Sequence, residues 1–382
     1  MNAIVLTTIN VPRVLENYID NCNKYDHKDV AFIVVGDRKS PSETASYLAS
    51  LQGYEIIYLG IEEQKEWLKK IPAFRDYLPY DSVQRRNIGY LYAGRIGADV
   101  IISIDDDNIP LPEYDYIGEH SIVGKTIECE SVSSSNGWFN TCSLLEAEPP
   151  HRFYHRGFPI SKRWIPEKLS YQREERRVVV NAGLWLTDPD VDTITRLEEP
   201  FSVVGVKDPY ARLLLSKGTM SPFNSQNTAF SIDLLPCLYL ITFRANTKGG
   251  VLRGNNNFRY DDIWMSYFAK IIIDHMGDAV CIGTPHIEQK RNKHNYLLDL
   301  WKELMPMEIT DKLVDTFSDI ELTKKSYYES YRELIDQIRL KVVMRYDLFD
   351  KDQQALLWNM TEGMSLWSDA VDCVIGRYKV KK

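Results

Sequence analysis

The chain has 382 residues, of which 44% are hydrophobic and 26% are charged, and its formal net charge is −8 at pH 7. These values are typical of a soluble globular protein of about two to three domains, and they disfavour a broad nucleic-acid surface, which needs a basic face. No apolar run approaches the ~20 residues that cross a bilayer, so we expect no transmembrane segment.

Two features bear on the cellular compartment. Residues 1–8 lack the basic region and the cleavage site of a signal peptide and have the composition of a first strand. The six cysteines are scattered, without a Cys-x-x-Cys pair. Free thiols in a reducing compartment explain this pattern better than a disulfide framework or a zinc site. We therefore expect a cytoplasmic protein, and homo-oligomerisation is left open.

The N-terminal part of the chain alternates between strand and helix patterns. Strands are expected at 3–8, 30–35 and 55–59 and a helix at 14–25, and Gly36-Asp37 follows the second strand. This alternation predicts an α/β fold with a mostly parallel central sheet. No GxGxxG follows the first strand and no GxxxxGK[ST] occurs in the chain, so neither a dinucleotide fold nor a P-loop is indicated.

A helix is expected at 81–97, and it carries Arg85 and Arg86 near its start. Its apolar residues fall at helical spacings, which predicts packing on the sheet. Because a guanidinium group binds phosphate through paired hydrogen bonds, these arginines are candidates for contact with an anionic ligand above the strand ends. A solvated basic helix face is the alternative interpretation.

The stretch 98–110 carries the most specific chemical signal. Residues 100–104 have the composition of a strand buried on both faces, and Asp105, Asp106 and Asp107 follow directly, before Pro110. Adjacent carboxylates repel one another unless a cation compensates them, and open α/β sheets bind ligands at this edge. Carboxylate oxygens suit Mg²⁺ or Mn²⁺, which share their shell with substrate phosphates. The stretch therefore predicts a metal–diphosphate site, and an acidic turn is the alternative.

Residues 151–164 combine aromatic and basic side chains, among them Arg156. This mixture suits sugars and phosphates, and it also occurs in solvated surface loops. A strand expected at 178–180 leads into Gly183 and Trp185. Glycine permits a close backbone approach, and a tryptophan ring can stack on a sugar or belong to the core. Arg156, Gly183 and Trp185 are therefore candidate substrate-binding residues.

Asp261 and Asp262 open a helix that is expected to run to about residue 276. Capping explains one acid at a helix start, and the second is a candidate general base. The basic loop 289–294, with Lys290 and Arg291, is interpreted either as a cover over a diphosphate or as a solvated charge run. Helical spacing from about residue 305 onward predicts an α-helical extension, which gives domains at 1–304 and 305–382.

Four motifs occur in a fixed order, namely Ile-Ser-Ile-Asp-Asp-Asp (102–107), Arg-Gly-Phe-Pro-Ile-Ser (156–161), Gly-Leu-Trp-Leu (183–186) and Arg-Tyr-Asp-Asp-Ile-Trp (259–264). In this order and spacing they resemble the signature blocks of the reversibly glycosylated polypeptide family, which includes the UDP-arabinopyranose mutases. The resemblance covers about residues 3–305. It implies a GT-A type glycosyltransferase fold, a UDP-sugar ligand such as UDP-arabinose, and Mn²⁺ or Mg²⁺ as the metal.

The resemblance also implies residue roles. Asp105, Asp106 and Asp107 would hold the metal, with the outer two as direct ligands, and Asp262 would face the sugar and the acceptor. The nucleoside would be cradled by Thr7, Thr8, Asn10 and Asp37, and the nucleotide or diphosphate would be contacted by Arg86 and Asn87.

One position departs from the family pattern. Mutases of the family carry a reversibly glycosylated arginine seven residues before the Arg-Gly-Tyr-Pro block, where this chain has Pro149, with Arg152 nearby. The leading hypothesis is therefore a metal-dependent glycosyltransferase that uses a UDP-sugar donor and an unidentified acceptor. The alternative is a UDP-sugar mutase that interconverts the pyranose and furanose forms of arabinose. A third hypothesis, a sugar-nucleotide-binding subunit without activity, is disfavoured by the clustered acids.

Overall fold

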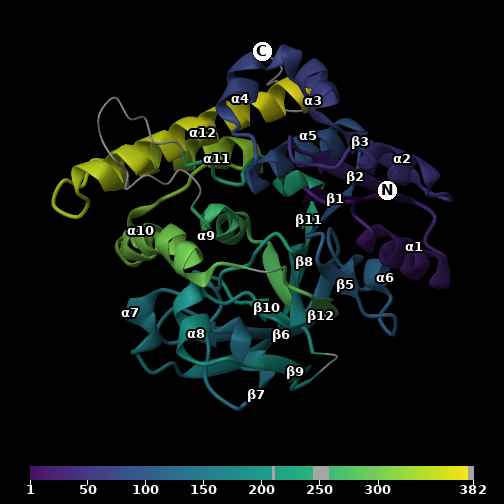
Figure 1. The fold of residues 1–382 in the computed structure, drawn as a ribbon. Coiled ribbons are helices and arrows are strands. Elements are labelled where there is room, and N and C mark those ends of the chain that lie inside the picture. The colour runs from purple at the N-terminus through teal and green to yellow at the C-terminus, as the bar shows by residue number, and fades with distance from the viewer. Residues whose placement is uncertain (209–210, 244–257, 293, 377–382) are drawn as a thin grey trace.

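The structure, a computed structural model, describes residues 1–208, 211–243, 258–292 and 294–376 (Figure 1). Within these residues, a twelve-stranded sheet runs through the molecule and helices cover it. Its strands are β1 (Asn2–Thr8), β2 (Val30–Gly36), β3 (Glu55–Leu59), β4 (Val100–Ile104), β5 (Asn108–Pro110), β6 (Thr126–Ser134), β7 (Leu145–Glu148), β8 (Leu169–Thr187), β9 (Ser202–Val206), β10 (Leu213–Leu215), β11 (Asn227–Ser231) and β12 (Ala279–Gln289).

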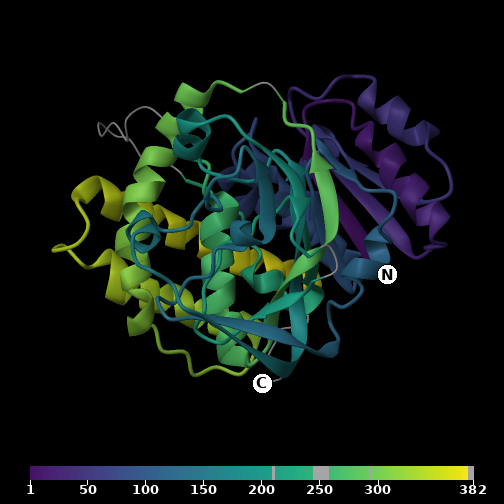
Figure 2. The same cartoon turned by 90° about the horizontal axis from the view of Figure 1, so that it is seen from below.

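The N-terminal strands lie in the order β3-β2-β1-β4, and all three of their pairings are parallel. Figure 2 shows these purple and blue elements gathered on one side of the molecule. The α/β class is confirmed, and the strands expected here agree with the observed ones to within a residue. Because the strands are parallel, the carboxyl ends of β1, β2 and β4 meet at the same edge, where ligands bind in open α/β sheets.

Beyond β4 the sheet is mixed. Strand β11 is antiparallel to β4 and β8, and β8 is antiparallel to β6 but parallel to β12. The mostly parallel sheet that we expected therefore holds for the N-terminal half only. Parallel neighbours need long crossover connections, usually helical, and the chain between β6 and β12 supplies few helices of that length.

The helices are α1 (Val14–Lys24), α2 (Thr44–Ser50), α3 (Ile61–Trp67), α4 (Pro72–Tyr77), α5 (Arg86–Arg95), α6 (Tyr116–His120), α7 (Ile160–Arg163), α8 (Thr193–Glu198), α9 (Asp261–Met276), α10 (Tyr296–Asp315), α11 (Tyr327–Ile338) and α12 (Lys351–Ile375). Shorter 3₁₀ turns occur at η1 (Leu68–Lys70), η2 (Val83–Arg85), η3 (Thr141–Leu144), η4 (Ile232–Cys237) and η5 (Phe317–Asp319), and a π turn occurs at η6 (Arg339–Val343).

Helix α5 packs directly on β1 and β2 and brings Arg86 to the strand ends. A Cβ added to Gly89 would meet Val5 Cγ1 at 2.5 Å, so this close approach requires glycine. The predicted helix at 81–97 is confirmed, with its first turn wound as the 3₁₀ turn η2. This position of α5 decides where the arginines of its first turn point.

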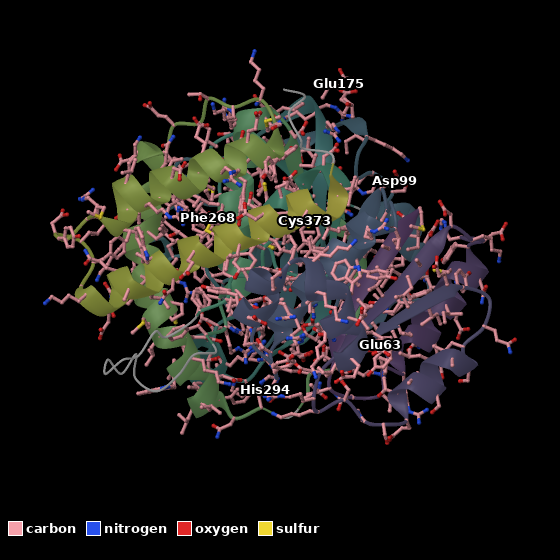
Figure 3. All side chains as sticks on the ribbon, turned by 90° about the horizontal axis from the view of Figure 1, so that it is seen from above. Glu63, Asp99, Glu175, Phe268, His294 and Cys373 are labelled. Atoms are coloured by element: carbon pink, nitrogen blue, oxygen red, sulfur yellow. The ribbon has the colours of Figure 1, made fainter. Side chains whose placement is uncertain are left out.

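The C-terminal helices share the core of the N-terminal half. Helix α12 packs on α4 and α5, and it crosses the molecule in Figure 3, where Cys373 is labelled near its end. Its Trp367 is fully buried, stacks on Tyr239 with ring centroids 5.9 Å apart, and donates its indole N–H to the Pro236 carbonyl at 3.0 Å. The boundary expected at 304/305 falls inside α10, and the core runs continuously across it.

The six cysteines are free thiols, as expected, and four of them are buried. None of the helices in the described ranges is both long enough and apolar enough to pass through a lipid bilayer.

Candidate functional site

A cleft of about 660 Å³ opens at the edge where β1, β2 and β4 end. This volume falls in the range of small-molecule sites, about 300–1,000 Å³. The cleft is lined by Thr7, Thr8, Ile9, Asn10, Val35, Gly36, Asp37, Asp81, Ser82, Val83, Arg85, Arg86, Asp105, Asp106, Asp107, Arg156, Ser225, Gln226, Phe258, Arg259, Asp261, Asp262, Asn292, His294, Asp299 and Lys302. The topology thus brings most of the predicted site residues into one cavity.

The acidic stretch after β4 forms the floor of the cleft. Asp106 accepts hydrogen bonds from Thr8 Oγ1 at 2.6 Å and from Asn10 Nδ2 at 3.1 Å. Asp107 accepts a longer one from Asn108 Nδ2 at 3.3 Å. Burial and the neighbouring charges of Asp105 and Asp106 raise the pKa of Asp107 to about 7. Negative charge is therefore incompletely compensated at this point of the cleft.

Arg86 is the buried cation behind the acidic stretch. Its guanidinium pairs with Asp105, donates to the Ser225 carbonyl at 2.8 Å and reaches Thr7 Oγ1 at 3.2 Å. Burial by itself lowers the pKa of Arg86, but the charge and hydrogen bond of Asp105, with Tyr90 and Asp262, together outweigh burial and raise the pKa above its ordinary value. Arg86 is therefore a fixed positive charge beneath the floor of the cleft.

Asp37 lies where the nucleoside end was predicted. One of its carboxylate oxygens accepts from the Arg38 N–H at 2.8 Å and the other from the Ser82 N–H at 3.1 Å. Ser40 Oγ donates to the Thr8 carbonyl at 2.8 Å and so ties this turn to the end of β1. These contacts fix the turns after β1 and β2 relative to each other.

Asp261 and Asp262 begin α9 and are both buried, but their partners differ. Asp262 accepts from Arg156 at 3.2 Å and from the Ser225 N–H at 3.1 Å. Asp261 has a single side-chain contact, with Gln84 Nε2 at 3.2 Å, and burial together with the Asp262 charge raises its pKa to about 7. Asp261 therefore changes protonation near neutral pH, whereas Asp262 is engaged by Arg156 and by the Ser225 N–H.

Asp190 is a functional-site residue that the sequence analysis did not single out. It is fully buried and binds Arg156 through two hydrogen bonds of 2.8 and 2.9 Å, and it also accepts from Asn224 Nδ2 at 2.7 Å. Burial raises its pKa, but the charge and hydrogen bonds of Arg156, with His155 and Asn224, together outweigh burial and leave the pKa below its ordinary value. Asp190 thus holds Arg156 so that its outer nitrogen faces Asp262.

Three predicted residues lie away from the cleft, and the structure corrects their expected position. Asn87 is buried and exchanges two hydrogen bonds of 2.8 Å with the backbone of Leu240. Trp185 is 2% exposed and packs edge-on against His155 in the core. A Cβ on Gly183 would lie 2.2 Å from Asn227 Nδ2, so this glycine serves strand packing.

The side chains of Lys290 and Arg291, in the basic loop after β12, do not form a cover over the cleft, which was one of the two interpretations of this loop. Lys290 is exposed and pairs with Glu288 at 3.3 Å, although its backbone N–H donates to the Asp107 carbonyl at 3.0 Å. Arg291 is turned inward toward Asp188, and burial lowers its pKa to about 10. Neither side chain lines the cleft, and the loop residue at position 293 lies outside the described part of the chain.

The far wall of the cleft comes from the start of α10 and was not predicted. Asp299 accepts from His294 Nδ1 at 2.7 Å and pairs with Arg259 at 2.7 Å; His294 is labelled in Figure 3. Burial raises the pKa of Asp299, but these two partners lower it below its ordinary value. Lys302, one turn later, also lines the wall. The spacing of Asp299 and Lys302 on one helix face is a signal, but only the fold shows that this face meets the cleft.

The donor atoms of the cleft fit a hard divalent cation. Among the described residues, its lining holds eight Asp side chains against five of Lys or Arg, so these residues favour a cation beside an entering diphosphate. Among the described residues, no three acidic, His or Cys side chains form a ready-made metal centre. Mg²⁺, however, is typically bound by one or two carboxylates together with substrate phosphates and water. The oxygen-only set of Asp105, Asp106 and Asp107 meets that requirement.

No arginine takes the place that the family resemblance marks for a glycosylated one. Pro149 lies in an exposed segment after β7, and Arg152 is 60% exposed and pairs with Glu167 at 3.4 Å. Neither residue lines the cleft. Arg156 and Arg259 are the arginines that reach the cleft beside Asp262.

Two of the curated proteins that are similar to this chain are both named as UDP-arabinopyranose mutases. The chain is 28% identical over 242 residues to UDP-arabinopyranose mutase 2 of Arabidopsis thaliana, which covers 63% of this chain and 59% of that protein. It is 29% identical over 251 residues to the probable UDP-arabinopyranose mutase 1 of Solanum tuberosum, covering 65% and 60%. The chain thus spans about three fifths of the length of the curated relatives it matches.

Among solved structures, S. aureus TarS residues 1–349 align with 99% of this chain and 93% of TarS, at 10% identity and a TM-score of 0.33. The same protein in complex with UDP-GlcNAc aligns with a TM-score of 0.34. A likeness of this degree does not identify a shared substrate. The family model described as reversibly glycosylated polypeptide matches residues 4–371, nearly the whole chain, and the chain therefore belongs to the reversibly glycosylated polypeptide family.

Proposed function

We propose that this protein is an enzyme that acts on a UDP-linked sugar, and that its reaction is the interconversion of UDP-arabinopyranose and UDP-arabinofuranose. The observation that carries the proposal is the meeting of Asp105–Asp107, Arg86 and Asp261 in one cleft of a chain from this family. The relatives named as mutases favour this reaction over the glycosyl transfer that the sequence analysis placed first. They also count against a binding subunit without activity.

Different residues of the cleft would bind different parts of the substrate. Thr7, Thr8, Asn10 and Asp37 would receive the nucleoside, and Asp105 and Asp107 would hold Mn²⁺ or Mg²⁺. When bound, such an ion offsets the charge of the diphosphate and holds the substrate in the cleft. Arg86 adds a buried positive charge on the same side, which further offsets the negative charge of the diphosphate.

Ring contraction requires one proton to move from the sugar 4-hydroxyl to the ring oxygen. The 4-oxygen then bonds to the anomeric carbon while the bond from that carbon to the ring oxygen breaks. We assign this transfer to Asp261, because a carboxyl whose pKa is about 7 both accepts and returns a proton near neutral pH. Asp262 and Arg156, which are paired with each other, would orient the sugar hydroxyls.

The test is incubation of purified protein with UDP-arabinopyranose and Mn²⁺, with chromatographic separation of the two ring forms. The proposal expects UDP-arabinofuranose from the wild type and at least about 100-fold less from Asp261→Asn, since proton-transfer groups contribute about 10²–10⁴-fold. Asp369→Asn, an exposed surface change, is the matched control and should keep full activity. Wild type that binds UDP but forms no furanose would overturn the mutase assignment.

Glycosyl transfer from a UDP-sugar to a separate acceptor is the second candidate. It is favoured by Pro149, which stands where mutases of the family carry the glycosylated arginine. The wall from α10 adds Asp299 and Lys302 to the cleft, and these residues could contact a second substrate. A panel of UDP-sugars scored for UDP release, with and without acceptors, separates this candidate from the first.

A further inference from the structure

The α10 wall carries a cation with no counter-charge. Lys302 lines the cleft, and its ammonium group forms no ion pair or hydrogen bond with another side chain in the described ranges. The other basic groups of this wall are compensated, since Arg259 and His294 share Asp299. An uncompensated lysine in the wall of the cleft favours an anionic group there.

The first half of α10 has an inverted distribution of polarity. Its acids Asp299 and Glu303 are buried, whereas Leu297, Trp301 and Leu304 are 72%, 45% and 43% exposed. A helix at a protein surface ordinarily presents its apolar stripe to the core and its charges to water. Because the acids are buried and the apolar side chains face solvent, a stripe of large apolar side chains is exposed beside the cleft. Exposed patches of this kind mark binding surfaces.

The apolar stripe is continuous with the free cation. Leu298 is 48% exposed and lies four residues before Lys302, on the same face of the helix. On the other side of the stripe, α8 adds Ile194 and Leu197, which are 40% and 45% exposed. Helix α8 is held against α10 by the Thr193 N–H, which donates to the Glu303 carboxylate at 2.7 Å. We call Leu297, Leu298, Trp301, Leu304, Ile194 and Leu197 the apolar rim.

We propose that Lys302 and the apolar rim form an acceptor subsite, and that the acceptor is a phosphate monoester carried on a long apolar chain. The inference rests on the second candidate function, transfer to a separate acceptor. Free phosphate would satisfy Lys302 but leave the rim exposed. A protein partner would cover the rim but would not place an anion inside the cleft. A lipid phosphate would place its anionic group at Lys302 and cover the apolar rim with its chain.

The transfer step balances without a further reagent. A phosphate oxygen of the acceptor forms the new bond to the anomeric carbon, and the bond from that carbon to the UDP oxygen breaks, with UDP taking the electron pair. A phosphate monoester is largely dianionic at neutral pH, so its oxygen needs no base to remove a proton. This suits a cleft in which Asp262 is already committed to Arg156.

Binding is tested with vesicles of phosphatidylcholine that contain farnesyl phosphate, with farnesol vesicles and inorganic phosphate as comparisons. We expect binding to farnesyl phosphate vesicles to exceed that to farnesol vesicles by about tenfold or more, because a charge-assisted contact is lost in the alcohol. Lys302→Gln should abolish this preference, and Leu297→Ser with Trp301→Ser should weaken binding to both vesicles. Tyr171→Ser with Val204→Ser, at exposed positions on β8 and β9, is the matched control and should change neither.

Two outcomes would overturn the proposal. Equal binding of the wild type to both kinds of vesicle would remove the role of the phosphate. Full binding by the Leu297→Ser, Trp301→Ser variant would remove the role of the apolar rim. In parallel, thermal shift with UDP and Mn²⁺ reports on the donor site alone, so its failure is distinguishable from failure of the acceptor subsite. Sugar transfer from UDP-arabinose to farnesyl phosphate, and not to farnesol, is the expected activity.

Discussion

The buried pair of Asp190 and Arg156 gives the most direct test of how this site is built. In Asp190→Asn the side chain keeps its shape, but Arg156 loses the carboxylate that binds it at 2.8 and 2.9 Å. Removing one partner of a buried ion pair costs about 3–5 kcal/mol. Because Arg156 keeps Asp262 at 3.2 Å, we expect a loss at the lower end, about 3 kcal/mol.

The pH dependence of the loss identifies its cause. The folded-state pKa of Asp190 lies below its ordinary value, because Arg156 and the other partners of this carboxylate together outweigh burial. A carboxyl of this kind adds stability that is fully present above its unfolded pKa of about 3.9 and is lost as pH falls through the folded value. The difference in unfolding free energy between wild type and variant should therefore be full at pH 7 and should narrow below about pH 4.

Urea unfolding followed by tryptophan fluorescence measures this difference. Asp233→Asn is the control, since Asp233 is 52% exposed where it pairs with Arg177 and such surface pairs contribute about 0–1 kcal/mol. If Asp190→Asn costs no more than the control at pH 7, then Asp262 alone compensates Arg156 and the reasoning is refuted. The same variant should also lower turnover, because Arg156 is no longer held toward Asp262.

Three further predictions follow from the site. Asp261→Asn should unfold at higher urea than wild type at pH 8 and equally at pH 3. A folded-state pKa of about 7, against an unfolded value of about 3.9, means that ionisation of Asp261 costs the wild type stability progressively as pH rises through this interval. Lower stability of the variant at pH 8 would contradict this. Gly183→Ala should lower the free energy of unfolding in urea by about 1–3 kcal/mol, because the added Cβ clashes with Asn227, and it should leave KM unchanged. An altered KM would show that Gly183 contributes to substrate binding. In titration calorimetry, Mn²⁺ should raise the affinity of the wild type for UDP by about tenfold, and Asp107→Asn should lose most of this gain. An undiminished gain in the variant would exclude Asp107 as a metal ligand.

Much of the site could be predicted from local sequence. A run of apolar residues followed by Asp105, Asp106 and Asp107 indicates where a buried strand lies. It also indicates that negative charge stands at the carboxyl end of that strand. Parallel neighbours then place Thr8 and Asp37 at the same edge, because parallel strands share a carboxyl side. Asp261 and Asp262 could be found because adjacent acids at a helix start exceed what capping needs. Composition and chain direction were sufficient for these residues.

The tertiary structure decided which neighbouring residues take part. Asn87 and Trp185 have side chains that suit a ligand, but long-range packing turns them toward Leu240 and His155. Asp190 and Lys302 join the site because β8 and α10 arrive there from distant parts of the chain. A sequence shows which side chains can ionise or bond, whereas their burial and partners, and hence their pKa and reach, depend on contacts between segments that only folding brings together.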